Sequence, residues 1–366
     1  MLTLPDVFYK LEPPYCLMHT STHTQDSAAV LPDTAPKRLP FWFLMTLYIA
    51  VPFALVFICI DTFWLNGHYR GLLPQSPYEI YFYNVIFVLP HIIASLILQL
   101  NPEYLKVYGR RFTGAALVCV ATVTGLVLFS IIMAQTAIFY NVMLDVMLIY
   151  TALTVYHVFM QQLGLNALFS RYRGLGFQIL RWSALVPMIT VSMDPALYAN
   201  DKNQLFSMAI TYSIAISICA TIVASILFYR NSKTRAGKLY LLANLCLLAT
   251  TFIAFHMGYP IFILLPRVVH DTTAFSIYVT HARNRAEDTA AAPNILLRPF
   301  IKRISPPLFY LSPIVAMALS FPISKNLFIY SSWVIMALTL LHYYIEHMVW
   351  RRGSPHRKYI GFSGIK

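Results

Sequence analysis

Several histidines and carboxylates of this sequence lie inside segments that are otherwise strongly apolar. Most of these segments are long enough to cross a membrane, where an ionisable side chain is expensive and marks a candidate functional site. Imidazole and carboxylate are common ligands of iron, zinc and copper. The sequence therefore predicts a transition-metal site, with metal ligands drawn from His91, His157, His270, His281, His342 and His347, and with Glu346 and Asp271 as the candidate catalytic carboxylates.

The segment 259–282 carries most of this polar chemistry. Arg267, His270, Asp271, Tyr278 and His281 are spaced so that a helix would place them on one face. Arg267 and Asp271 are four residues apart, and we expect them to pair. His270 and His281 are separated by about 16 Å along a helix axis, so they cannot bind one ion together. Either a second ion is present, or one of these histidines orients or gates the site.

Histidines from three further segments are expected at a similar membrane depth. At 1.5 Å per residue, His91, His157 and His342 lie about 13, 7 and 10 Å from the cytoplasmic ends of their helices. Glu346 follows His342 by one helical turn. These residues therefore share the cytoplasmic half of the membrane, and together they predict one site formed by several helices.

The composition of the chain indicates the kind of fold that positions these residues. The chain has 366 residues, of which 58% are hydrophobic and only 11% are charged. Soluble proteins are nearer one quarter charged, so a soluble or disordered chain is excluded. We predict an all-α, polytopic integral membrane bundle of about ten transmembrane helices, near 40–60, 80–100, 112–134, 138–162, 176–194, 205–229, 238–257, 259–282, 306–322 and 327–349.

The basic residues predict the orientation of these helices. If 259–282 crosses the membrane, 23 of the 27 lysines and arginines fall on the side of the N-terminus and only three on the other. Basic loops face the cytoplasm, so both termini are predicted to be cytoplasmic. The expected parts are a partly disordered arm over 1–39, the membrane domain over 40–350 and a basic tail over 351–366. In that tail we expect His356 to face lipid headgroups.

The net charge of +13 is assigned to membrane topology and anionic lipids rather than to nucleic acid, because the basic residues lie in short loops between apolar segments. We expect a multi-pass protein of an inner or plasma membrane. No pair of cysteines has metal-binding spacing, which leaves histidine and carboxylate as the ligands.

In its ligand chemistry the arrangement resembles integral-membrane iron oxygenases such as desaturases and hydroxylases. Their paired-histidine boxes are absent here, so the resemblance assigns no residue role and no substrate. We expect iron rather than zinc, an apolar or lipid substrate, and an electron donor as partner. A proton-coupled transporter that uses Arg267, His270, Asp271 and His281 is the alternative, and structural hydrogen bonding by these histidines is the third reading.

Overall fold

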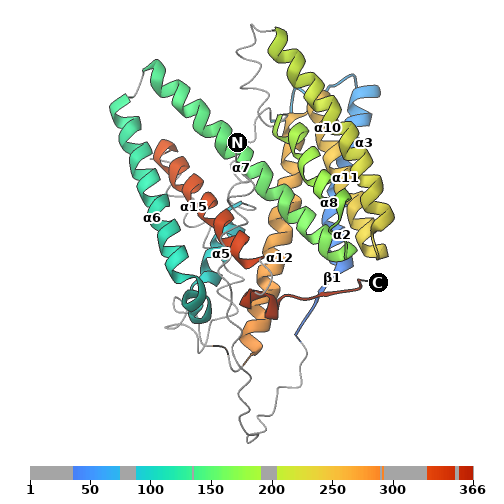
Figure 1. The fold of residues 1–366 in the computed structure, drawn as a ribbon. Coiled ribbons are helices and arrows are strands. Elements are labelled where there is room, and N and C mark those ends of the chain that lie inside the picture. The colour runs from blue at the N-terminus through green and yellow to red at the C-terminus, as the bar shows by residue number, and fades with distance from the viewer. Residues whose placement is uncertain are drawn as a thin grey trace, which may run out of the picture. The chain divides into compact units, whose positions relative to one another are not determined.

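The computed structural model describes residues 36–74, 88–133, 136–190, 204–288, 291, 328–350 and 354–365. Residues Pro36–Lys366 form one compact unit. Within it, long helices dominate and the only strands described are two of two residues each (Figure 1). The all-α prediction is therefore confirmed.

The helices follow one another along most of the described chain. Their bounds are α2 (Phe41–Thr46), η1 (Leu47–Ile49), α3 (Ala50–Phe63), α5 (Leu89–Gln99), α6 (Pro102–Met133), α7 (Ala137–Ser170), α8 (Leu175–Ser183), α10 (Gln204–Asn231), α11 (Arg235–His256), η4 (Pro260–Leu264), α12 (Leu265–Glu287), α15 (Phe328–Val349) and η5 (Pro355–Tyr359). Strands β1 (Leu39–Pro40) and β2 (Phe362–Ser363) pair in parallel.

Five helical segments are long and apolar enough to cross a membrane, which indicates a membrane protein. They are Phe41–Phe63, Pro102–Met133, Asn141–Ser170, Ile210–Asn231 and Arg235–His256. In α6, large apolar side chains are exposed along much of the helix, among them Leu117, Val118 and Ile132. Such a surface is suited to lipid rather than to water.

Two predicted spans differ from the helices found. The span 176–194 is interrupted, because α8 ends at Ser183, Ala184 lies in a turn and the helix resumes at residue 185; residues 191–194 lie outside the described residues. Pro187 explains the break, since a proline ring clashes with the carbonyl four residues earlier, here that of Ser183. The segment 259–282 is helical, as a short 3-10 turn, η4, followed by α12. The predicted span 306–322 and most of 80–88 lie outside the described residues.

Helix α12 carries the polar stripe and is largely buried. It packs against α5, α7, α11 and η5, while α15 packs against α5 and α6. Buried along it are Val269, Ala274 and Ile277 as well as the polar residues of the stripe. The helices that carry His91, His157, His270 and His342 are therefore neighbours in the bundle.

The C-terminal segment folds back onto one end of the bundle. Strand β2 pairs with β1, and η5 packs against α6, α12 and α15. Asn284 of α12 connects both terminal segments: its amide Nδ2 donates to the carbonyl oxygens of Lys37 and Tyr359, at 2.7 and 2.9 Å. This end of α12 is thus held by the segment just before α2 and by η5, which follows α15.

Candidate metal centre

Four helices bring six of the eight predicted site residues together. Two overlapping groups of metal-ligating side chains result, with ligand atoms that lie within 4.8 Å of one another in each group. One group contains His157, His270, His342 and Glu346, and the other contains His91, His270 and Asp271. The contributing helices are α5, α7, α12 and α15, whose packing against one another is described above.

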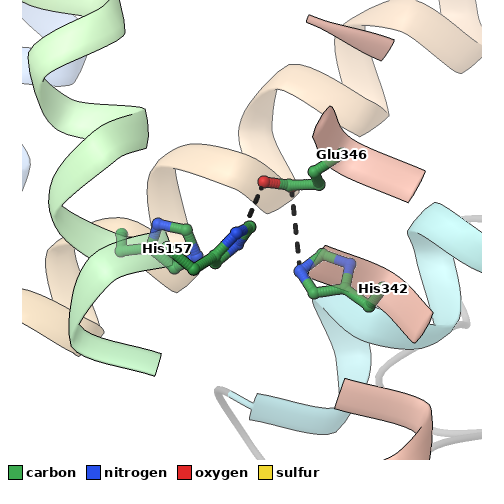
Figure 2. Close-up of side chains that lie close together, drawn as sticks. His157, His342 and Glu346 are labelled. Atoms are coloured by element: carbon green, nitrogen blue, oxygen red, sulfur yellow. Dashed lines mark ion pairs between the residues drawn. The ribbon is translucent and has the colours of Figure 1, made fainter. Parts of the chain in front are cut away.

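Glu346 is the centre of the first group. Figure 2 shows its carboxylate between the rings of His157 and His342. Its oxygens lie 3.2 Å from His157 Nε2 and 3.8 Å from His342 Nε2. Ligand atoms bound to one ion at about 2.0–2.2 Å are separated by roughly 3–4 Å. The observed separations therefore fall within the range of a shared ion.

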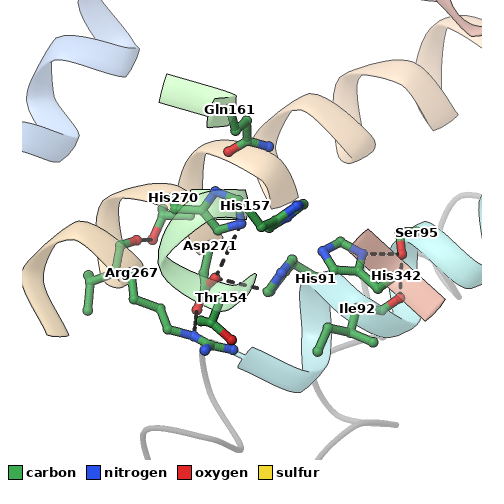
Figure 3. A network of polar contacts seen from close by, with 12 residues as sticks. His91, Ile92, Ser95, Thr154, His157, Gln161, Arg267, His270, Asp271 and His342 are labelled. Atoms are coloured by element: carbon green, nitrogen blue, oxygen red, sulfur yellow. Dashed lines mark hydrogen bonds and ion pairs between the residues drawn. The ribbon is translucent and has the colours of Figure 1, made fainter. Parts of the chain in front are cut away.

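His342 of α15 is oriented by Ser95, which lies on the neighbouring helix α5. Ser95 Oγ lies 2.7 Å from His342 Nδ1 and also 2.7 Å from the carbonyl oxygen of Ile92, to which it donates (Figure 3). Because its only proton goes to that carbonyl, the hydroxyl accepts from Nδ1–H. His342 Nε2 then keeps its lone pair and points at Glu346. Fixing a histidine in this way is typical of the residues that support metal ligands.

Glu346 is held in place by two donors. The Tyr278 hydroxyl donates to Oε1, and Gln161 Nε2 donates to Oε2 at 3.3 Å. Only 1% of Glu346 is exposed. Since each carboxylate oxygen has two lone pairs, both can accept these bonds and still face the histidines.

His157 is fixed by a stacked tyrosine. The rings of His157 and Tyr343 are 3.9 Å apart between centroids, at an angle of 21°. The Tyr343 hydroxyl in turn donates to Thr154 Oγ1 at 2.9 Å, one turn before His157 on α7. Helices α7 and α15 are thereby connected beside the ligand group.

Asp271 is the centre of the second group (Figure 3). Its carboxylate lies 3.5 Å from His91 Nδ1, 3.8 Å from His270 Nε2 and 3.6 Å from Arg267 Nε. The ion pair with Arg267 is the one expected from their spacing of four residues. Asp271 is 1% exposed, so this charge is withdrawn from solvent.

Several buried atoms of the two groups have no hydrogen-bond partner within the described residues. They are His157 Nε2, His342 Nε2, His270 Nδ1 and both carboxylate oxygens of Asp271. A buried polar atom left unpaired costs about 1–3 kcal/mol, so a cluster of them needs an explanation. All can act as electron-pair donors to a cation.

The remaining two candidate ligands lie outside both groups. His281 Nε2 is 2.8 Å from the Tyr104 hydroxyl, near the cytoplasmic end predicted for α12. His347 is exposed on α15, on a different face from His342 and Glu346. His270 and His281 were expected to be too far apart to bind one ion. In the structure His270 belongs to both ligand groups, whereas His281 lies beside Tyr104.

His356 was expected to face lipid headgroups, and this is wrong. Its ring is fully buried and stacks on Tyr104, with centroids 3.5 Å apart. Its Nε2 lies 3.2 Å from Gln99 Nε2. Burial, and secondarily the charge of Arg285, lowers the pKa of His356 to about 3. The reason is that the C-terminal segment folds back onto α6 and α12 instead of extending along the membrane surface.

Sequence reasoning missed Ser95 and the supporting role of Gln161. Ser95 lies four residues after His91, so the same helical face was already marked, but a hydroxyl in an apolar helix usually bonds its own backbone. No family model, curated protein or solved structure matches the chain.

Proposed function

We propose that this protein is an integral-membrane metalloprotein that holds a transition-metal ion between His157, His270, His342 and Glu346. The observation that carries the proposal is the first ligand group: four side chains from three helices, with ligand atoms within 4.8 Å of one another. Three of its ring nitrogens are buried and have no hydrogen-bond partner among the described residues. Burial removes water as the alternative partner, so a cation is the species that best completes the site.

The second group supports the first. His270 belongs to both, and its Nε2 faces the Asp271 carboxylate while Nδ1 is free of hydrogen bonds. A carboxylate behind a ligating imidazole fixes the ring and raises its basicity. Arg267 limits the negative charge that Asp271 adds. In this proposal His91 and Asp271 orient the site, and His281 and His347 are not ligands.

The donor set favours a redox-active ion. Histidine with one carboxylate and no thiolate is the ligand chemistry of non-haem iron, and it also suits zinc. We infer an iron-dependent oxygenase, hydroxylase or desaturase that acts on a lipid or another apolar substrate. Iron would supply the capacity to activate oxygen, and an external electron donor would be required as partner. Tyr278 would hold a proton at Glu346 Oε1, and the apolar helices around the site would keep water out.

We place this site in the cytoplasmic half of the membrane, within a bundle of about ten crossings. The distribution of basic residues supports this placement. An apolar substrate could then enter from the lipid, while reductant reaches the site from the aqueous side.

A proton-coupled transporter is the second candidate, and one observation favours it. Arg267, Asp271, His91 and His270 form a buried chain of titratable groups with contacts of 3.5–3.8 Å. Such a chain could pass protons across the membrane without any metal. In that case the protein in liposomes should move protons with a solute and should need no bound ion.

Oxygen uptake tests the enzyme proposal. Purified protein is stripped with a chelator, reloaded with Fe²⁺ or Zn²⁺, and given a reductant and a membrane-lipid extract. We expect uptake only after iron loading, and none in His157→Ala. The matched control is His347→Ala, which removes an exposed imidazole from the same bundle and should behave as the unaltered protein. Proton flux in liposomes without metal would support the transporter instead.

A further inference from the structure

A cavity lies outside the two ligand groups, at the end of the bundle where α7 and α15 finish. It has a volume of about 280 Å³, close to the lower limit of roughly 300 Å³ for ligand pockets. The lining comes from three places in the sequence: the end of α7, the residue after α15 and the C-terminal segment. Its residues include Leu168, Arg171, Trp350, Arg357, Phe362 and Ile365.

The polar side chains of this lining are all hydrogen-bond donors. Arg171 and Arg357 carry permanent positive charge and have no acceptor atoms. Trp350 contributes an indole N–H, which is also donor only. Nothing among these side chains can accept a hydrogen bond, so a ligand that matches them must be rich in acceptors and preferably anionic.

These donors are not satisfied within the described part of the chain. Neither Arg171 nor Arg357 forms an ion pair there, whereas nearby Lys358 pairs with Asp288 at 2.6 Å. The indole nitrogen Nε1 of Trp350 is buried and has no hydrogen-bond partner. Arg171 is exposed and Arg357 is half-buried, so water can solvate both, but the buried Trp350 N–H has no such alternative. An anion in the cavity would satisfy that N–H and face both cations.

The rest of the lining is apolar and continuous with the protein core. Leu168, Trp350, Ile360, Phe362 and Ile365 all pack against the main hydrophobic cluster. A small inorganic anion would leave this surface without a partner. An amphiphile, with a charged group on the arginines and a hydrocarbon part on the apolar wall, would use both.

We propose that this cavity binds the phosphate group of an anionic lipid, held by Arg171, Arg357 and the Trp350 indole. Guanidinium groups bind phosphate oxygens through paired hydrogen bonds. The topology argued above puts this end of the bundle at the cytoplasmic leaflet, where anionic lipids are concentrated. The proposal does not depend on the metal centre or on the reaction proposed for it.

Native mass spectrometry of the purified protein tests this site. The probes are phosphatidic acid, phosphatidylcholine and inorganic phosphate. We expect phosphatidic acid to bind at least tenfold more tightly than phosphatidylcholine. The double variant Arg171→Gln/Arg357→Gln should lose this preference. Trp350→Phe keeps the ring without its N–H and should weaken binding roughly fivefold.

The matched control is Arg173→Gln, which removes an exposed positive charge two residues from Arg171, outside the lining. It should keep the full preference. Melting temperatures show whether the variants fold. Arg357→Lys retains the positive charge but loses the paired hydrogen bonds of the guanidinium group. Equal binding of the two lipids, or an equal loss in the control, would overturn the proposal. Inorganic phosphate that displaces phosphatidic acid at equal concentration would overturn the assignment to a lipid.

Discussion

Replacing Ser95 by alanine tests how His342 is prepared for a metal. Ser95 Oγ is the acceptor for His342 Nδ1–H at 2.7 Å, in a site where both residues are buried. Alanine leaves that N–H without a partner, which costs about 1–3 kcal/mol. At 1.4 kcal/mol per factor of ten, metal affinity should fall roughly 5- to 150-fold, in line with the 10- to 100-fold typical of such supporting residues.

The assay is competition for the metal against a chelator of known affinity, with the variant protein in detergent. Ser130→Ala is the control, because Ser130 also donates to a carbonyl in its own helix, that of Leu126, and contacts no histidine among the described residues. It should retain the original affinity. Unchanged affinity in Ser95→Ala, or the same loss in both variants, would refute the proposed orientation of His342.

Three further predictions concern charge, pH and topology. Asp271→Ala should destabilise the protein by about 3–5 kcal/mol by removing the buried carboxylate that faces Arg267, whereas Arg267→Gln/Asp271→Asn should cost less. Equal unfolding free energies would argue against the pair. Burial lowers the pKa of His356 to about 3, below about 6.5 in the unfolded chain, so the unfolded chain binds more protons as the pH falls. The stability advantage of the native protein over His356→Gln should therefore shrink by on the order of 4 kcal/mol between about pH 6.5 and pH 3, and parallel pH profiles would contradict this. In a cysteine-free background, Leu72→Cys should label only from the outer face and Glu287→Cys only from the cytoplasmic face; labelling of both from one face would remove the crossing by α12.

The sequence was sufficient to predict an all-α chain and which of the described residues gather at the site. Ionisable residues at helical spacing indicated which face of α12 is buried. The rise per residue gave His91, His157 and His342 similar depths in the membrane, and the structure brings all three into the two ligand groups. These are local properties: periodicity, hydropathy and rise per residue. The break at Ala184 is local as well, because Pro187 prevents a helical hydrogen bond to the carbonyl of Ser183.

Other parts depend on contacts between distant segments. The burial of His356 results from the pairing of β2 with β1 and the packing of η5 on α12, which no local pattern encodes. The same applies to the contact between Ser95 and His342, which are 247 residues apart. The role of these residues depends on which neighbouring helix each helix face contacts. Hydropathy shows only which face is apolar, so it cannot identify the neighbour.

The metal content of the purified protein tests the central claim most directly. Inductively coupled plasma mass spectrometry should find a stoichiometric transition metal in the native protein and in His347→Ala, and little in His157→Ala or His342→Ala. Removing one ligand should leave the fold intact, because the helices are held mainly by packing. If the native protein carries no such metal, or if the two ligand variants retain it, the metalloprotein account is contradicted.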